Sequence, residues 1–158
     1  NVALSDKNIE YVELELSESN YGDHRVRIQK NNGLDNEIRR KVIRVEAKTI
    51  DTFLEGYDLS EALLFMDTQG HEGHVLSGGK NLIEACVPII TEFWPYGLKR
   101  SNGIEIFYEA LAKSRYNCLR DLRTPEKKYK FTIDTLIKIE LELGEGPLGA
   151  TDLIIYKE

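Results

Sequence analysis

The sequence has little that could stabilise the protein covalently or through a metal ion. It contains two cysteines, Cys86 and Cys118, which lie far apart and match no metal-binding or redox spacing. We therefore expect two reduced thiols in the core, where free cysteine is usually found. The two neighbouring histidines, His71 and His74, are three residues apart, whereas the zinc-protease helix requires a spacing of four.

Long apolar segments and excess positive charge are also missing. No apolar run approaches the roughly 20 residues that a membrane-spanning helix needs. The formal net charge is -6, and nucleic acids and anionic membranes require a basic face instead. No signal-type segment stands at the beginning of the sequence. We therefore expect a cytoplasmic protein whose main partner is neither a nucleic acid nor a membrane.

The composition suits one folded domain. Apolar residues make up 41% and charged residues 30% of the 158 residues, which are ordinary proportions for a globular domain with a core. The chain begins at Asn1, and residues 2–4 are typical of the last residues of a strand. We therefore predict a single domain over residues 1–158 that is truncated at its N-terminus.

The first third of the chain carries the patterns of a small antiparallel insert. Residues 9–16 alternate between apolar and mostly acidic side chains, as in a half-buried strand. Residues 24–29 alternate again, the turn-forming residues 31–33 follow, and residues 42–45 suit another strand. We predict two or three antiparallel strands, within about residues 9–47, beside the main sheet.

Strand-like and helix-like patterns alternate over the remaining chain, which predicts an α/β fold. The expected strands cover residues 63–66, 87–94, 116–122 and 152–156. The expected helices cover approximately residues 49–54, 71–76, 80–85, 104–111 and 133–141.

Residues 63–76 carry the most functional information. Four apolar residues run directly into Asp67, and such a short run is typical of a strand buried on both faces. Gly70 then permits a sharp turn into a helix. The polar side chains of this turn are therefore expected at the carboxyl edge of a sheet, where open α/β sheets bind ligands.

Six short motifs occur in order over nearly the whole chain. They are residues 1–6 (NVALSD), 20–25 (NYGDHR), 49–53 (TIDTF), 67–72 (DTQGHE), 87–95 (VPIITEFWP) and 151–154 (TDLI). This ordered set resembles the FkbM family of S-adenosylmethionine-dependent methyltransferases. The family commonly has a lysine before the Ile-Asp pair, where this sequence has Phe65 and Met66.

The resemblance implies a fold, a cofactor and a partner class. The fold is the class I methyltransferase Rossmann-like sheet, mostly parallel, with helices on both faces. The cofactor is S-adenosylmethionine in the intact domain. The family's Gly-rich loop and its ribose-binding acid belong to strands that would precede Asn1, so we expect this chain to be the later part of the catalytic domain.

The resemblance and the position of the strand ends together assign candidate site residues. The cofactor candidates are Ala3, Ser5, Asp6 and Asp67. The substrate candidates are Asn20, Asp23, Arg25, Gln69, Glu72, Glu92 and Trp94. The catalytic candidates are Asp67 and His71.

Methyl transfer to a hydroxyl requires positioning and removal of a proton. His71 is a candidate base because an imidazole titrates near physiological pH. Asp67 is the stronger candidate, since an acid directly after four apolar residues costs free energy unless it is paired or used. Each also has a purely structural interpretation: His71 and Glu72 can begin a helix, and Trp94 can be a core or rim residue.

We thus expect methylation of a hydroxyl on a sugar or small metabolite. The alternative is a non-catalytic binding or interaction module whose exposed sheet edge pairs with a partner or with a second copy. A metal-dependent hydrolase using Asp67, His71, Glu72 and His74 ranks last, and we assign no metal ligands from the sequence.

Overall fold

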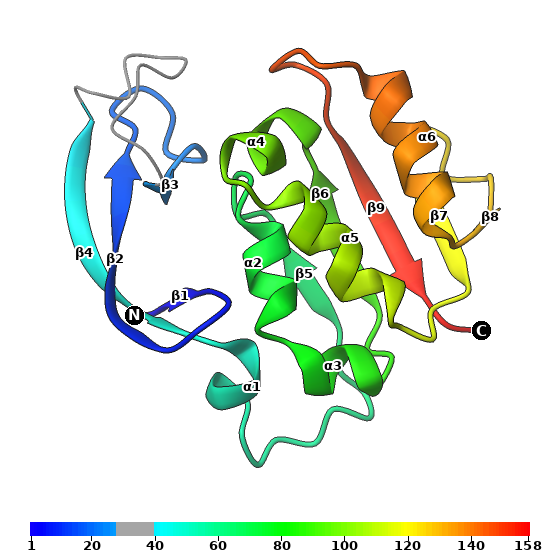
Figure 1. The fold of residues 1–158 in the computed structure, drawn as a ribbon, viewed down its shortest axis with the longest axis horizontal. Coiled ribbons are helices and arrows are strands. Elements are labelled where there is room, and N and C mark those ends of the chain that lie inside the picture. The colour runs from blue at the N-terminus through cyan, green and yellow to red at the C-terminus, as the bar shows by residue number, and fades with distance from the viewer. Residues whose placement is uncertain (28–39) are drawn as a thin grey trace.

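The computed structural model describes residues 1–27 and 40–158 (Figure 1). The turn predicted at residues 31–33 and the end of the strand predicted at 24–29 lie outside the described residues. Within them the fold is mixed α/β, with two sheets and six helices. None of these helices is long and apolar enough to cross a membrane.

The first sheet contains the predicted antiparallel insert. Its order is β1 (Ala3–Leu4), β4 (Lys41–Lys48), β2 (Ile9–Leu16) and β3 (Arg25–Val26). β2 is antiparallel to both β3 and β4, as predicted, whereas β1 is parallel to β4.

The alternation of β2 does not bury an apolar face as expected, because its most buried side chain is Glu15, at 1% exposure. Arg25 and Arg27 lie 3.6 and 3.5 Å from the Glu15 carboxylate, which explains how this charge is accommodated.

The second sheet is mixed rather than mostly parallel, so that part of the prediction is wrong. Its order is β5 (Leu64–Met66), β6 (Ile89–Phe93), β9 (Thr151–Tyr156), β7 (Cys118–Asp121) and β8 (Tyr129–Lys130). Only β5 and β6 pair in parallel, and the other three pairs are antiparallel. The last strand inserts between β6 and β7 in the opposite direction, which an alternating strand and helix pattern cannot reveal.

The helices are α1 (Ile50–Phe53), α2 (Glu72–Ser77), α3 (Lys80–Glu84), α4 (Pro95–Arg100), α5 (Ile104–Ala112) and α6 (Ile133–Leu143). The sequence patterns do not predict α4, because Pro95 and Gly97 are residues that commonly end a strand. Proline is also favoured in the first turn of a helix, where its missing N–H costs nothing.

The described helices form one layer rather than covering both faces of the second sheet. α2 contacts α5, and α5 contacts both α4 and α6 (Figure 1). Ile89, Phe93 and Leu153 on the covered face are fully buried. Phe65 points to the opposite face and is 70% exposed.

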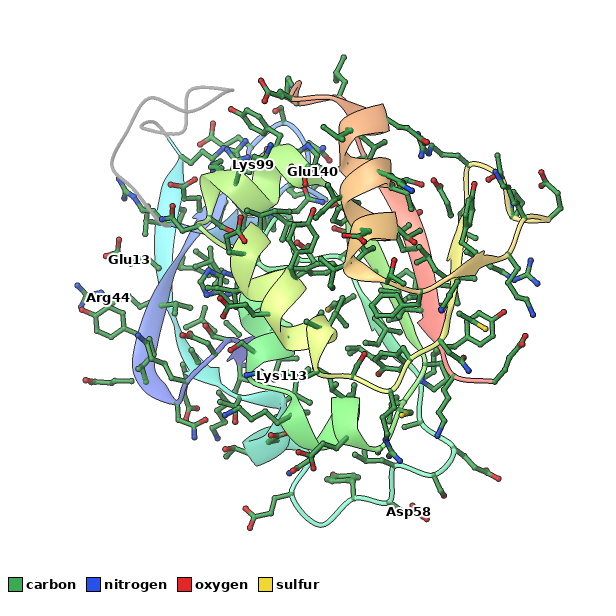
Figure 2. All side chains as sticks on the ribbon, turned by 45° about the vertical axis from the view of Figure 1, so that its right-hand side comes forward. Glu13, Arg44, Asp58, Lys99, Lys113 and Glu140 are labelled. Atoms are coloured by element: carbon green, nitrogen blue, oxygen red, sulfur yellow. The ribbon has the colours of Figure 1, made fainter. Side chains whose placement is uncertain are left out.

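Glu140 of α6 ties this helix layer together. Its carboxylate accepts a hydrogen bond of 2.5 Å from the Tyr108 hydroxyl of α5. The ammonium of Lys99 in α4 lies 2.8 Å away (Figure 2). Burial and the adjacent Glu140 carboxylate raise the pKa of Tyr108 far above its usual value, so the hydroxyl remains a donor.

β5 lies at the edge of the second sheet, which contradicts the prediction of a central strand buried on both faces. Among the described strands it pairs only with β6. Leu63, just before β5, is 58% exposed, and Phe65 is the most exposed residue of the strand itself. A short apolar run shows that a strand is favoured, but its burial depends on neighbours that are distant in sequence.

The predicted core thiols are confirmed for one cysteine only. Both cysteines are free; Cys118 is buried in β7, whereas Cys86 is only partly buried beyond α3. Cys86 also has a positive φ of 57°, so it serves as a turn residue rather than as a regular core position.

We expect Phe93→Ala to lower the free energy of unfolding by about 3–5 kcal/mol, because a fully buried aromatic ring is removed from the core. The ring also packs 5.5 Å from that of Phe107. Urea unfolding measures the change. The matched control is Phe53→Ala, at a ring that is 53% exposed, with an expected effect within about 0.5 kcal/mol. Equal losses in the two variants would contradict the assignment of the core.

Candidate functional site

The carboxyl ends of β5 and β6 bring two predicted site residues together. The parallel register places Met66 opposite Thr91, so Asp67 and Glu92 follow side by side. The side-chain amide of Gln69 donates to Asp67 Oδ1 at 2.7 Å and to Glu92 Oε2 at 3.4 Å. These three predicted residues thus share one edge of the second sheet, as the sequence analysis expected.

The turn after β5 requires unusual backbone conformations. Gln69 has a φ of 53° and Gly70 a φ of 93°. A Cβ on Gly70 would also lie 2.6 Å from the carbonyl group of Gly97 in α4. Only glycine tolerates both conditions, so this residue holds the turn closely against α4.

Glu72, the first residue of α2, is hydrogen-bonded to the turn that precedes the helix. It is fully buried, and its Oε1 accepts hydrogen bonds from the Thr68 amide, the Thr68 hydroxyl and the Gly70 amide at 2.8, 2.9 and 3.2 Å. Burial raises the pKa of Glu72, and these donors act in the opposite direction. Its other oxygen, Oε2, has no hydrogen-bond partner among the described residues.

Three carboxylates therefore converge at this edge. Asp67, Glu72 and Glu92 each place one oxygen within 4.8 Å of the others. Burial, followed by the charges of Asp67 and Glu72, raises the pKa of Glu92 to about 8. Asp152, opposite Glu92 in β9, contributes in the same direction. Sequence reasoning missed Asp152, because nothing in the local pattern indicates that β9 lies beside β6.

His71 belongs to a second, separate group. Its Nε2 lies 3.1 Å from the Ser5 hydroxyl, and that hydroxyl donates to Asp6 Oδ1 at 3.1 Å. Because Ser5 uses its proton toward Asp6, the imidazole donates from Nε2. The Nδ1 atom has no hydrogen-bond partner among the described residues. Three predicted residues, from segments far apart in the chain, are thus brought together.

The environment of His71 keeps it neutral. Burial, followed by the charge of the nearby His74, lowers its pKa to about 4. The two rings stack with centroids 4.5 Å apart, and His74 Nε2 lies 3.0 Å from the carbonyl oxygen of Ser101. The metal-ligand set considered from the sequence is therefore divided, since both imidazoles have other partners and only Asp67 and Glu72 remain together.

A close approach between α2 and the loop after β1 holds the Ser5 group in place. A Cβ on Gly78, at the end of α2, would lie 2.2 Å from the Ser5 carbonyl oxygen. The Ser5 amide in turn donates to the Lys48 carbonyl at 2.9 Å. The first sheet and α2 are thereby joined at the predicted cofactor residues. Ala3, also predicted, lies in β1 opposite Ala47.

Three predicted substrate residues belong to the region of the first sheet, where Asn20 and Asp23 lie in the loop between β2 and β3 and Arg25 begins β3. Arg25 is buried against Glu15, and Asp23 forms an ion pair with Arg40 at 2.5 Å. The exposed Asn20 accepts a hydrogen bond from the Gly22 amide at 3.1 Å, as in a turn. No described contact joins these residues to the strand-end carboxylates, and their partners account for a structural role.

Trp94 also has a structural partner. Its indole N–H donates to the Pro147 carbonyl at 2.8 Å, and its ring lies 5.6 Å from that of Tyr96. The residue follows β6 directly, so it lies near the same edge as Glu92. The rim position that the sequence analysis left open therefore agrees with its partial burial.

The comparison with protein families agrees with the resemblance found in the motifs. Residues 1–122 match the Methyltransferase FkbM domain, which covers 122 of the 158 residues. The chain belongs to the FkbM methyltransferase family. The match includes the group formed by Ser5, Asp6 and His71 and the group formed by Asp67, Gln69 and Glu92. The last motif, residues 151–154, lies beyond it. No curated protein and no solved structure matches the chain.

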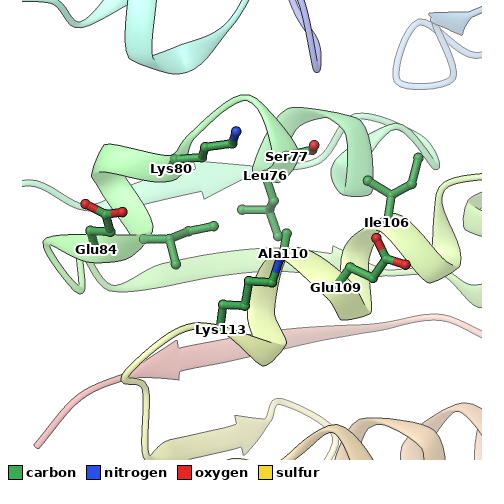
Figure 3. Close-up of a pocket in the computed structure, with 9 residues that line it drawn as sticks. Leu76, Ser77, Lys80, Glu84, Ile106, Glu109, Ala110 and Lys113 are labelled. Atoms are coloured by element: carbon green, nitrogen blue, oxygen red, sulfur yellow. The ribbon is translucent and has the colours of Figure 1, made fainter.

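A pocket of the FkbM domain lies away from these groups. It has a volume of about 350 Å³ and lies between α2, α3 and α5 (Figure 3). The buried Leu76 and Ile83 line it, together with the exposed Lys80 and Lys113. None of the residues predicted from the sequence lines it. Its charged lining residues come from separate segments of the chain and form no sequence motif, so the pocket could not be predicted from the sequence.

The described residues offer carboxylates for two parts of S-adenosylmethionine, its adenine and its sulphonium, but not for the rest of the molecule. The exposed Asp6 carboxylate, next to the buried Ser5, suits a hydrogen bond from an adenine amino group. Asp67 is exposed at the strand edge, where a charged sulphonium would meet a carboxylate. No Gly-rich turn from a strand into a helix is present among the described residues to hold the rest of the cofactor.

The pKa of His71 makes folding stability depend on pH. Because its pKa falls from 6.5 in the unfolded chain to about 4 in the fold, the unfolded chain binds the extra proton between these values. The free energy of unfolding therefore decreases as the pH falls from about 6.5 to about 4, by up to about 1.4 kcal/mol per pH unit. His71→Gln should flatten this part of the curve. Urea unfolding at several pH values tests this, and a His71 NMR titration midpoint near 6.5 would contradict it.

Proposed function

We propose that this FkbM protein transfers a methyl group from S-adenosylmethionine to a hydroxyl of a sugar or small metabolite. The observation that carries the proposal is the Asp67, Gln69 and Glu92 group at the end of the parallel strand pair. Family membership supports the reaction type. The hydroxyl is our inference from the chemistry of this group, since carboxylates accept hydrogen bonds from hydroxyls and can take their protons.

The carboxylates would orient the acceptor and receive its proton. Asp67 is exposed and can be reached by an acceptor, whereas Glu92 lies deeper beside it. Gln69 holds both through its amide, which limits their movement and favours one geometry for the reaction. A carboxyl group with a pKa near 8, as in Glu92, is well matched to proton transfer near neutral pH.

His71 acts in this proposal by positioning rather than by proton transfer. Its lowered pKa makes it a weak base at neutral pH. Its bond to Ser5 instead holds the loop that carries Asp6, the residue suited to the adenine amino group. The cofactor, when bound, supplies the electrophilic methyl group, and the chain's own residues bind and orient the two reactants.

We expect Asp67→Asn and Glu92→Gln to lower kcat of the intact protein by about 10²- to 10⁴-fold, the usual loss when a positioned proton acceptor is removed. The control is Glu126→Gln, which removes an exposed carboxylate from the turn between β7 and β8. Calorimetry should first show binding of S-adenosylmethionine by the wild-type protein. A folded wild-type sample that binds none would contradict the proposal.

The exposed edge of β5 supports a second candidate, a non-catalytic interaction module. Leu63 and Phe65 are both exposed there, and β5 pairs on one side only among the described strands. An open strand edge with apolar side chains is a template for pairing with another chain. A second copy of the protein is the simplest such partner.

Sedimentation velocity of the chain tests this candidate. We expect concentration-dependent dimers that Phe65→Lys disrupts, because a charged edge residue opposes pairing. Tyr57→Lys, at another exposed aromatic residue, serves as the control. A monomer at every concentration would rule out self-association through β5 and leave the catalytic proposal untouched.

A further inference from the structure

The three converging carboxylates have no compensating cation among the described residues. Asp67, Glu72 and Glu92 come from the end of β5, the start of α2 and β6, and one oxygen of each lies within 4.8 Å of the others. None of the ion pairs described within residues 1–27 and 40–158 involves them. Like charges at this spacing repel one another, unless a proton or a cation is shared between them.

Glu72 supplies the observation that points to a ligand. Its side chain is 0% exposed, and it turns a carboxylate oxygen toward both other acids. Three donors hold Oε1, whereas the buried Oε2 has no hydrogen-bond partner among the described residues. A buried carboxylate oxygen without a partner is costly, and such an atom in a native structure calls for a missing ion or water.

We propose that Asp67, Glu72 and Glu92 bind a divalent cation of the hard, oxygen-preferring class, such as Mg²⁺ or Mn²⁺. Carboxylate oxygens are the ligands these ions prefer, and softer metals are disfavoured because His71 and His74 have other partners. The site is open to solvent through the exposed Asp67. This assignment goes beyond methyl transfer and does not require it.

The surroundings are built to orient the ligands. Gln69 donates to both Asp67 and Glu92, while the turn residues Thr68 and Gly70 fix Glu72. Hydrogen bonds of this kind orient metal-binding carboxylates and strengthen their affinity. Three carboxylates leave further coordination positions of an octahedral ion for water or for an acceptor hydroxyl. The last role, binding the hydroxyl, rests on the function proposed above.

Mn²⁺ binding, followed by electron paramagnetic resonance, tests the site without any cofactor or acceptor. We expect one Mn²⁺ per wild-type chain, displaced by excess Mg²⁺. Glu92→Gln and Asp67→Asn should each raise the Kd at least about tenfold, since each removes a charged ligand. Glu126→Gln should leave the Kd unchanged. Glu72→Gln is not required, which avoids a variant at a fully buried position.

Two results would overturn the proposal: a folded wild-type protein without saturable Mn²⁺ binding, or Glu92→Gln binding Mn²⁺ as tightly as the wild type. Neither result bears on S-adenosylmethionine binding, which calorimetry measures in the absence of divalent ions. Conversely, failure to bind S-adenosylmethionine leaves the cation site standing. The two proposals are thus separated by experiment.

Discussion

The site depends on the parallel pairing of β5 with β6. Their register places Met66 opposite Thr91, and the residues that follow therefore meet at one end of the sheet. Asp67 and Glu92 are 25 positions apart in sequence, yet Gln69 hydrogen-bonds to both. This register brings the Asp67 and Glu92 carboxylates together. The turn that joins β5 to α2 passes through Gly70, which packs closely against Gly97 of α4.

Two buried glutamates show how differently the structure treats the same group. Glu15 in the first sheet lies within ion-pair distance of Arg25, Arg27 and Arg100, so its charge is balanced by the protein itself. Glu72 is buried to a similar degree, but hydrogen-bond donors hold its Oε1, and the carboxylates of Asp67 and Glu92 lie nearby. The first arrangement connects the insert to α4 through Arg100, whereas the second directs carboxylate oxygens toward one another at a strand edge.

The two groups of candidate residues are joined by α2. Glu72 at its beginning belongs to the carboxylate group, and Gly78 at its end packs against Ser5. Since His71 and His74 also lie in or beside this helix, a shift of α2 would move both groups together. A helix of six residues thus links the acceptor side of the proposed site to the loop that carries Asp6.

The sequence alone determined the family, through six ordered motifs, and the position of most strands and helices, through local periodicity. It also placed Asp67 and Glu92 at one edge, because the end of an apolar run marks the end of a strand. Only the tertiary structure decided the antiparallel entry of β9, the exposure of Phe65 and the separation of His71 from Asp67. These depend on which strands become neighbours and on what covers them. Such contacts join residues far apart in the chain, and local sequence patterns carry no information about them.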